Sequence, residues 1–354
     1  MYKKAVLFCL ILVAACVWAL PVINLAFLDI SVYKQALIDE NTTAKKMLFS
    51  TDYIEGFARF YLYSKYGKTF DDNVIAGKDG YFFLGNYDSN VLDVITGKYK
   101  ADEQKINEFC QKLLELQSWY ESVGIEFLLV LAPNKHSIYK DKLPDELQYG
   151  GENNTDIIVK TAKNLGIKIL DLRSVLLENK DKMLYYKTDT HWNNRGALIA
   201  YNEIISTLKS KINLPKYEIQ NTKVSSGDLI RISKMSSFFK EYKEDDVKIV
   251  LNDDKIKACD IIKGVIDCSK NNNDLLNVYI KNDKAANELK LLYIADSFSF
   301  ATSKLVNHTF KEIYKIYRGK MRIKELKSFV ETNKPDIAIY QIVERNFFDK
   351  SLIK

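Results

Sequence analysis

The residues best suited to acid–base chemistry lie in YKTDTHWNNR, residues 186–195. His191 is one of three histidines in a chain of 354 residues, and Asp189 lies two positions before it. On an extended or turning backbone this spacing lets the carboxylate reach the imidazole Nδ1, which leaves Nε2 free to take a proton. A histidine that packs beside Trp192 and caps the following helix is the alternative. The segment alone leaves both interpretations open.

A candidate nucleophile lies in LLYIADSFSF, residues 291–300, where a hydrophobic run leads directly into Asp296 and Ser297. A serine at a strand-to-helix turn has its Oγ exposed at the edge of the sheet. The serine N–H, at a helix N-terminus, can stabilise an oxyanion. The alternative is a helix N-cap, a position in which Ser and Asp are also favoured.

A serine nucleophile needs a base, which is most often a histidine. His136 in PNKHSIY and His308 in VNHTF have no acidic neighbour. His308 also follows Ser297 by about three helical turns, which places it far from the sheet edge. His191 is therefore the best candidate for the base.

A metal site is the weaker interpretation of Asp189 and His191. Two ligands do not make a site, and no second His or Cys cluster supplies the others, although Asp171 and Asp296 could add oxygen ligands. Gly-rich phosphate loops are also absent from the sequence. We predict that the protein uses neither a metal nor a cofactor.

The composition is that of a globular protein, with 47% hydrophobic and 28% charged residues. The formal charge of +6 comes from 52 basic and 46 acidic residues spread along the chain. Nucleic-acid binding requires a concentrated basic stripe, and none is visible. We therefore predict no nucleic-acid partner.

The N-terminus has the pattern of a membrane anchor. Lys3 and Lys4 precede a run from Ala5 to Leu28 that contains no charged residue. At about 1.5 Å per residue, a helix over this run can cross the ~30 Å core of a bilayer. The two lysines favour an N-in orientation, with the remainder of the chain outside the cytoplasm. A cleaved signal peptide and a lipoprotein box at residues 13–16 (VAAC) are the alternatives.

Beyond residue 75 the sequence alternates between strand and helix patterns. The run 125–132 (IEFLLVLA) is apolar throughout, which is typical of a strand buried on both faces of a parallel sheet. Further strands are predicted at 167–172, 291–294, 313–317 and 336–343, and helices at 52–65, 101–123, 156–165, 195–209, 298–307 and 322–332. This alternation predicts an α/β domain with a mainly parallel sheet.

The domain plan follows from these patterns. We predict an anchor over residues 1–30, an N-terminal extension over 31–75, and an α/β domain over 76–354 with a variable insertion at about 212–290. In doubly wound sheets, chemistry gathers beyond the C-terminal ends of the strands. That rule selects four places: 133–137, 171–174, 295–299, and Arg318 with the loop 344–346.

Cys259 and Cys268 bracket ACDIIKGVIDC, in which Lys263 and Gly264 could turn a hairpin. A disulfide between them is plausible in an oxidising compartment. Their spacing does not suit a zinc site, because no partner pair of Cys or His accompanies them.

Five segments together resemble a known family: GKDGYFFLG (77–85), LAPNKHSIYKDKLP (131–144), TDTHWNNRGA (188–197), IADSFS (294–299) and PDIAIYQIVERNF (335–347). The chain resembles the alginate O-acetyltransferase family of AlgJ/AlgX-like, DHHW-type proteins, which have an SGNH-hydrolase-like domain. The D-x-H-W segment ahead of the D-S-F-S segment is the specific part. It is a circularly permuted motif order, since ordinary SGNH hydrolases have the serine first.

The resemblance implies a nucleophile at Ser297, a base at His191 and an orienting acid at Asp189. It also implies lower-ranked substrate or oxyanion contacts from Arg318, Tyr340 and Lys135. The implied activity is periplasmic transfer of an acetyl group, through a serine acyl-enzyme, to hydroxyls of a bacterial glycan. The implied partners are the glycan, the inner membrane, and a membrane-bound O-acyltransferase that supplies the acetyl group. A glycan acetyl-esterase and a non-catalytic glycan-binding or assembly protein remain the alternatives.

Overall fold

The structure is a computed structural model that describes residues 2–27, 48–87, 89–251, 256–269, 276–348 and 352. For residues 2–5 it describes the backbone alone. The predicted anchor (1–30), extension (31–75) and α/β domain (76–354) each include residues outside this range. Within it, one helix is long and apolar enough to cross a membrane, at Val6–Phe27.

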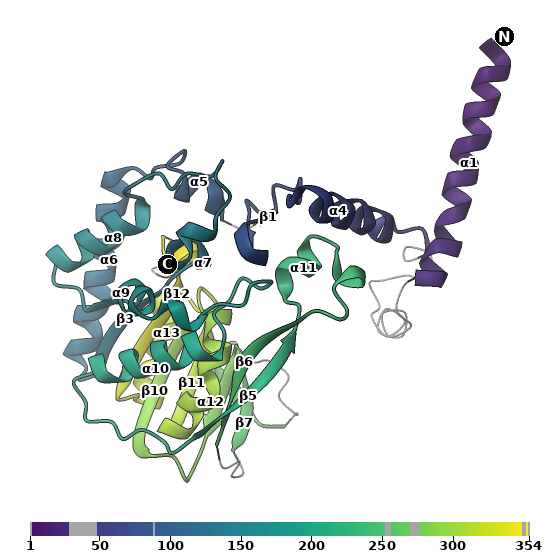
Figure 1. The fold of residues 1–354 in the computed structure, drawn as a ribbon. Helices are drawn as coiled ribbons and strands as arrows, with labels where there is room; N and C mark the ends of the chain where they lie inside the picture. Colours follow the sequence, from purple (N-terminus) through teal and green to yellow (C-terminus); the bar gives the residue numbers. More distant parts are fainter. Residues whose placement is uncertain are drawn as a thin grey trace.

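The N-terminal part consists of two helices that precede the first strand. Helix α1 (Tyr2–Phe27) extends away from the rest of the chain, and α4 (Asp52–Tyr66) lies between α1 and the α/β body (Figure 1). A small hairpin of β1 (Val74–Ala76) and β2 (Phe82–Leu84) follows, and all three residues of β2 are buried.

The body is built on an eight-stranded mixed sheet in the order β4-β3-β12-β10-β11-β9-β7-β8. The first five strands are parallel to one another, as predicted, and the last three are antiparallel. The strands are β3 (Glu126–Ala132), β4 (Ile169–Asp171), β7 (Lys257–Ile262), β8 (Val265–Asp267), β9 (Val278–Lys281), β10 (Asn287–Ala295), β11 (Phe310–Tyr317) and β12 (Ile337–Val343).

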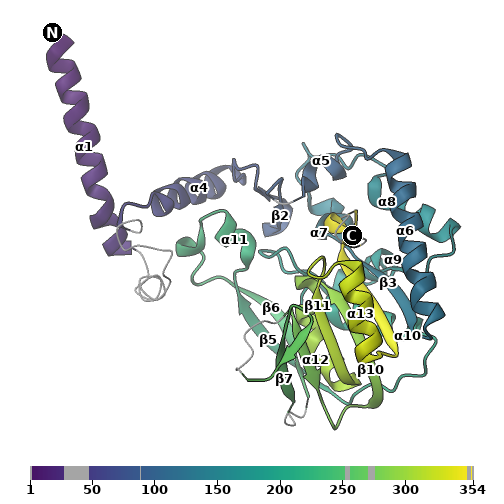
Figure 2. The ribbon, with the colours of Figure 1, turned by 180° about the vertical axis from the view of Figure 1, so that it is seen from behind.

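Helices cover both faces of the sheet. Buried side chains of α9 (Arg173–Glu178), α10 (Asn194–Thr207) and α12 (Phe300–Thr309) share one core with alternate strand residues. Those of α6 (Glu103–Ser122), α8 (Asn154–Asn164) and α13 (Ile323–Asn333) share the other. Helix α10 crosses in front of the strands in Figure 1, and α13 does so in Figure 2, which is the view from behind. The shorter helices are α5 (Val91–Ile95), α7 (Lys135–Ile138) and α11 (Asp228–Ile232).

The helix boundaries follow local capping. The Asp102 side chain accepts a hydrogen bond from Gln104 N–H and starts α6, which ends just before Gly124 as predicted. Asn153 and Asp156 form a reciprocal capping box at the start of α8. The Asn193 side chain accepts from Gly196 N–H and starts α10. Asn193 therefore caps a helix that begins three residues after His191.

The region 212–290, predicted as an insertion, contributes to the core architecture. Strands β7, β8 and β9 extend the main sheet, and Lys263 and Gly264 make the predicted turn between β7 and β8 with φ of 49° and 79°. Glycine suits this turn because it adopts positive φ without strain. A separate antiparallel ribbon of β5 (Glu218–Ser225) and β6 (Lys243–Val250) completes the region.

Candidate active site

The serine turn is fixed by the residue that precedes it. Asp296 follows β10 and is buried; its Oδ1 accepts a hydrogen bond from Phe298 N–H at 3.0 Å. Its Oδ2 accepts one from Val343 N–H, at the end of β12, at 2.7 Å. Burial raises the pKa of Asp296, while the two backbone donors and the charges of Arg345 and Arg318 act in the opposite direction. Asp296 thus ties the start of the turn to the neighbouring strand.

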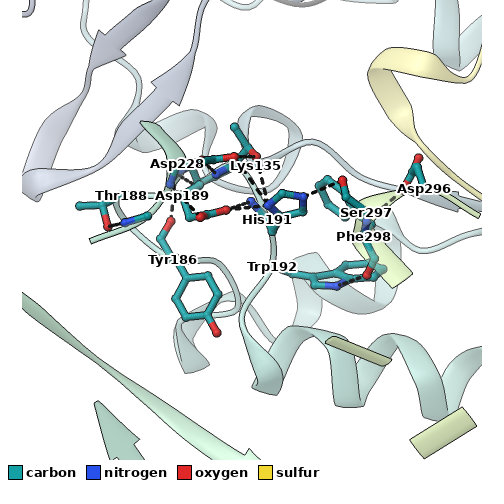
Figure 3. A network of polar contacts seen from close by, with 12 residues as sticks. Lys135, Tyr186, Thr188, Asp189, His191, Trp192, Asp228, Asp296, Ser297 and Phe298 are labelled. Atoms are coloured by element: carbon teal, nitrogen blue, oxygen red, sulfur yellow. Dashed lines mark hydrogen bonds and ion pairs between the residues drawn. The ribbon is translucent and has the colours of Figure 1, made fainter. Parts of the chain in front are cut away.

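Ser297, His191 and Asp189 form a continuous hydrogen-bonded chain (Figure 3). The Ser297 Oγ lies 2.8 Å from His191 Nε2, and His191 Nδ1 lies 2.6 Å from Asp189 Oδ1. The imidazole also packs against the Phe298 ring, with centroids 4.9 Å apart. The serine and the histidine are 106 positions apart in sequence, and the sheet edge brings them together.

Trp192 joins the same two segments. Its side chain is 1% exposed, and its indole Nε1–H donates a hydrogen bond to the Phe298 carbonyl at 2.9 Å. The Trp192 and Phe298 rings meet edge to face at 5.1 Å. The tryptophan of the D-x-H-W segment therefore holds the histidine loop against the serine turn.

The Asp189 carboxylate is held by three N–H groups. Oδ1 accepts from the backbone and the imidazole of His191, and Oδ2 accepts from Asp228 N–H at 2.9 Å. Burial raises the pKa of Asp189, but the hydrogen bond and charge of His191 outweigh it and lower the pKa to about 2. Asp189 is therefore ionised at neutral pH and directs Nε2 of the imidazole toward the serine.

Lys135 supports the histidine loop through its backbone carbonyls. Its side chain is 2% exposed, and Nζ donates to the carbonyls of Tyr186, Lys187 and Asp189 at 2.9, 3.1 and 2.6 Å. Burial lowers the pKa of Lys135 to about 8. Lys135, predicted as a substrate contact, thus has its ammonium group on the backbone of the histidine loop and not beside Ser297.

Carboxylates from the region 212–290 hold the other side of the loop. Asp228 on α11 accepts from Thr190 N–H at 2.8 Å and from the Thr190 hydroxyl at 2.6 Å. Glu244 on β6 accepts from Lys187 N–H and from the Thr188 hydroxyl.

Asp246, also on β6, accepts from the Tyr186 hydroxyl and from Asn194. Sequence reasoning missed Asp228, Glu244 and Asp246, because acidic residues in a lysine-rich region look like solvated surface.

Gly227 leaves room for this arrangement. A Cβ on Gly227 would lie 2.3 Å from Asp189 Cβ and 2.4 Å from its Oδ2. The residue before Asp228 must therefore be glycine if the Asp189 carboxylate is to keep its place.

The other predicted contacts differ in position. Tyr340 on β12 is 1% exposed, and its hydroxyl forms a hydrogen bond with the Tyr120 hydroxyl at 2.9 Å. Both residues lie in the core that α6 shares with the sheet. Since Trp192 and Phe298 belong to the core on the opposite face, Tyr340 points away from the serine. Arg318 lies where β11 ends, and its backbone N–H donates a hydrogen bond to the Ala295 carbonyl at 3.1 Å.

Arg345 lies near the serine, although sequence reasoning singled out only its loop. Its guanidinium carbon lies 5.5 Å from the centroid of Phe298, the residue after Ser297. One of its nitrogens donates to the Asn134 side chain at 3.2 Å. Arg345 and Arg318 both act to lower the pKa of Asp296, so both contribute positive potential at this edge.

The carboxylates that could bind a metal among the described residues already accept hydrogen bonds or form ion pairs within the chain. Asp189, His191 and Asp228 form one group of three whose ligand atoms lie within 4.8 Å of one another. The Asp189 and Asp228 carboxylates accept the N–H and O–H bonds given above. Asp171 pairs with Arg173, and Asp296 binds two backbone N–H groups. The absence of a bound metal therefore stays a prediction.

Cys259 and Cys268 form a disulfide that ties β7 to the residue after β8. These strands lie at the end of the sheet, with β9 and β11 between them and β10. The disulfide therefore belongs to the sheet edge farthest from Ser297 in strand order.

Known proteins resemble the chain in sequence and in fold. The family model described as "SGNH hydrolase-like domain, acetyltransferase AlgX" matches residues 74–258, more than half of the chain, including the Asp189–His191 segment. No curated protein matches by sequence.

The structure of PatB1 from Bacillus cereus with a sulfonyl adduct has a TM-score of 0.60 at 16% identity, covering 79% of this chain and 96% of that one. A DHHW family protein from Eubacterium siraeum has a TM-score of 0.54 at 13% identity, with coverage of 80% and 93%. The O-acetyltransferase domain of Pseudomonas putida AlgJ has a TM-score of 0.50 at 15% identity, with coverage of 78% and 93%. These likenesses show a shared SGNH-like α/β fold, and with the sequence match they show that the chain belongs to the AlgX family of SGNH hydrolase-like acetyltransferase domains.

Proposed function

We propose that the protein is a periplasmic O-acetyltransferase that moves an acetyl group through Ser297 onto hydroxyls of a bacterial glycan. The observation that carries this proposal is the chain of hydrogen bonds from Ser297 Oγ to His191 and on to Asp189, at 2.8 and 2.6 Å. A serine hydroxyl is a weak nucleophile at neutral pH, and an adjacent, oriented imidazole is what activates it. Membership in an acetyltransferase family supports acetyl as the group transferred.

In the first half-reaction, Ser297 Oγ attacks the carbonyl carbon of the acetyl donor as His191 Nε2 takes the hydroxyl proton. The imidazolium that forms is stabilised by the ionised Asp189 at Nδ1. When the tetrahedral intermediate collapses, the bond to the donor oxygen breaks. His191 returns the proton to that oxygen, and Ser297 is left as an acetyl ester.

In the second half-reaction, a sugar hydroxyl loses its proton to His191 Nε2 and attacks the acetyl ester. Collapse of this intermediate releases Ser297 Oγ, which regains the proton. Both intermediates carry an oxyanion, and we assign its stabilisation to the Ser297 backbone N–H with the positive potential of Arg345 and Arg318. Arg345 is the stronger candidate, because its guanidinium packs beside the ring of Phe298.

The location is proposed on the same basis. An uncleaved α1 would anchor the chain in the inner membrane, with its N-terminus inside and the α/β domain in the periplasm. The periplasm is oxidising, so the Cys259–Cys268 disulfide would be stable there. If α1 were cleaved as a signal, the domain would still be periplasmic. Acetyl-CoA is cytoplasmic, so we propose a membrane-bound O-acyltransferase as the partner that supplies acetyl groups. The domain limits of 1–30, 31–75 and 76–354 remain part of this proposal.

Acetyl release from p-nitrophenyl acetate, measured with and without an oligosaccharide acceptor, tests this function. The wild type should release p-nitrophenol and form acetylated sugar, Ser297→Ala should do neither, and a sulfonyl fluoride should modify the peptide that contains Ser297. Ser206→Ala, an exposed serine on α10, is the matched control and should keep wild-type rates. Full activity in Ser297→Ala would exclude the serine mechanism.

The acceptor arm separates transfer from hydrolysis. A glycan acetyl-esterase uses the same three residues, and water takes the place of the sugar hydroxyl at the acyl-enzyme. If oligosaccharides never gain acetyl while p-nitrophenol is released, the esterase is the correct assignment. A non-catalytic glycan-binding protein has no need of the bonded geometry of Ser297, His191 and Asp189, and it predicts no acetyl-enzyme at all.

A further inference from the structure

Helix α4 has an exposed apolar face in addition to the face that packs on the body. Ile54, Phe57 and Tyr61 have 43%, 54% and 53% of their surface exposed. Ala58 and Lys65 are exposed beside them. These positions recur at the spacing that aligns residues along one side of a helix. We call Ile54, Phe57, Ala58 and Tyr61 the outer stripe.

The opposite face of α4 fixes the direction of the outer stripe. A Cβ on Gly56 would lie 2.0 Å from the Lys234 carbonyl, so α4 and the segment after α11 are in backbone contact. Phe60 stacks on Phe238 with centroids 5.1 Å apart, and Phe57, at the edge of the outer stripe, also contacts Phe238 at 5.9 Å. Lys234 Nζ lies 2.7 Å from carboxylate oxygens of both Asp52 and Glu55. The acidic residues at the start of α4 therefore lie near Lys234, not on the outer stripe.

Helix α4 begins at the end of the apolar helix α1. Asn24, the one buried side chain among residues 6–27, donates from Nδ2 to the carbonyls of Leu48 and Ser50 at 2.7 and 2.9 Å. The Phe27 ring stacks on Tyr53, in the first turn of α4, at 4.9 Å. If α1 crosses a bilayer, α4 therefore starts at the surface of that bilayer.

The outer stripe has the chemistry of the membrane–water boundary. Helix α4 has 15 residues, too few to cross a bilayer but enough to lie along its surface. Lys65 Nζ lies over the rings of Tyr61 and Tyr66 at 5.8 and 5.2 Å. Tyr and Lys are characteristic of this boundary, because an apolar body enters the lipid while a polar tip stays in water.

We propose that the outer stripe of α4 lies in the interfacial layer of the bilayer that α1 crosses. Figure 1 shows α4 beside the upper end of the body, with α11 beneath α4 and α7 also near that upper end. Because β3, β12 and β10 are parallel, they end at the same edge of the sheet; α7 follows β3 at that edge, and Ser297 follows β10 there. The docked domain thus faces its serine toward the membrane. This inference rests on the proposed anchoring by α1, and it refines the proposed function by placing acetyl transfer at the lipid surface.

Depth measurements on the full chain in lipid nanodiscs test the proposal. Cys9 and Cys16, exposed on α1, are replaced by serine, and an environment-sensitive fluorophore is attached at Ile54→Cys or Tyr61→Cys. Ile219→Cys on β5 is the control, because the exposed fraction of Ile219, 52%, nearly equals that of Tyr61. Lipid with a nitroxide on the upper acyl chain should quench positions 54 and 61 several-fold and leave position 219 unchanged.

Two results would overturn the proposal. Equal quenching of all three positions by iodide, with none by the lipid nitroxide, would place the stripe in water. Protection of positions 54 and 61 from both quenchers would mean that a second copy of the chain covers the stripe. The measurement is repeated with Ser297→Ala, which should give the same quenching, so failure of the proposed chemistry and failure of the docking are distinguished. Hydrolysis of p-nitrophenyl acetate by each labelled protein, with the serine present, confirms that it is folded.

Discussion

Replacing Asp189 with asparagine gives the sharpest test of the proposed mechanism. The carboxylate accepts three N–H bonds, two from His191 and one from Asp228, and an amide can accept on its oxygen alone. If the oxygen of the new amide faced His191, its NH₂ would oppose the Asp228 N–H. If the NH₂ faced His191 instead, the imidazole would carry its proton on Nε2 and could not take one from Ser297.

The expected loss can be worked out for both orientations. With the oxygen toward His191, the imidazolium loses an anion at a charge separation of about 4 Å, which at an effective dielectric constant of about 20 is worth ~4 kcal/mol. One tenfold change in rate corresponds to about 1.4 kcal/mol, so this orientation costs roughly 10³-fold. With the imidazole in the wrong tautomer, the loss is about 10⁴-fold.

The assay is kcat/KM for p-nitrophenyl acetate at neutral pH, with urea unfolding to verify the fold. Asp189→Asn should lose roughly 10³- to 10⁴-fold, on the reasoning above. Asp181→Asn, an exposed aspartate earlier in the same connection, is the control and should be unchanged. A loss of less than about tenfold in a folded Asp189→Asn protein would refute the role of the Asp189–His191 pair, because neither orientation permits it.

Four further results are expected. Lys135→Met should lower the free energy of unfolding in urea by about 3 kcal/mol, because the carbonyls of Tyr186 and Asp189 lose their donor, whereas that of Lys187 keeps the Phe82 N–H. Gly227→Ala should cut ester hydrolysis by roughly 10²-fold with the fold retained, because the new Cβ displaces Asp189, whereas Ser226→Ala should leave it unchanged. Cys259→Ser should lower the free energy of unfolding by about 2–3 kcal/mol, for a loop that spans nine positions, without changing kcat/KM. The lowered pKa of Asp189 stabilises the folded state at pH above ~4, and this stabilisation should be lost as the pH falls toward about 2. In acid titrations of the free energy of unfolding, Asp189→Asn should not show this loss.

The sheet and most of its helices are predictable because burial leaves continuous apolar runs in the strands and a periodic apolar pattern in the helices. The apolar run before Pro133 became β3, and the run before Asp296 became β10. Helix starts carried local signals too, as Asn193 illustrates. What the runs do not encode is the face on which a given side chain lies. Every residue of β12 is buried, so no alternation in its sequence distinguishes the face of Tyr340 from that of its neighbours.

The serine, histidine and aspartate could be selected as candidates from the sequence because each lies beside a local feature: a strand end, a two-residue spacing, a neighbouring tryptophan. Their supports carry no such feature. Asp228 and Glu244 bind backbone N–H and threonine hydroxyls of the histidine loop from 38 and 57 positions away. Such pairing depends on the path of the chain, and a solvent-exposed aspartate has the same residue type. Lys135 was named through the family resemblance, and its residue type alone does not distinguish a buried lysine that binds backbone carbonyls from one that contacts a ligand.

Two aspartates next to the proposed catalytic groups have opposite roles, and their surroundings explain why. Asp296 adjoins Ser297 in sequence, but its carboxylate is buried against backbone N–H groups of Phe298 and Val343, and burial raises its pKa. Asp189 is distant from Ser297 in sequence, but it contacts the imidazole, and its pKa is lowered. A carboxylate that stabilises an imidazolium must remain ionised throughout the reaction. It must also contact the imidazole, which Asp189 does and Asp296 does not, so Asp189 is the proposed orienting acid and Asp296 fixes the turn that presents the serine.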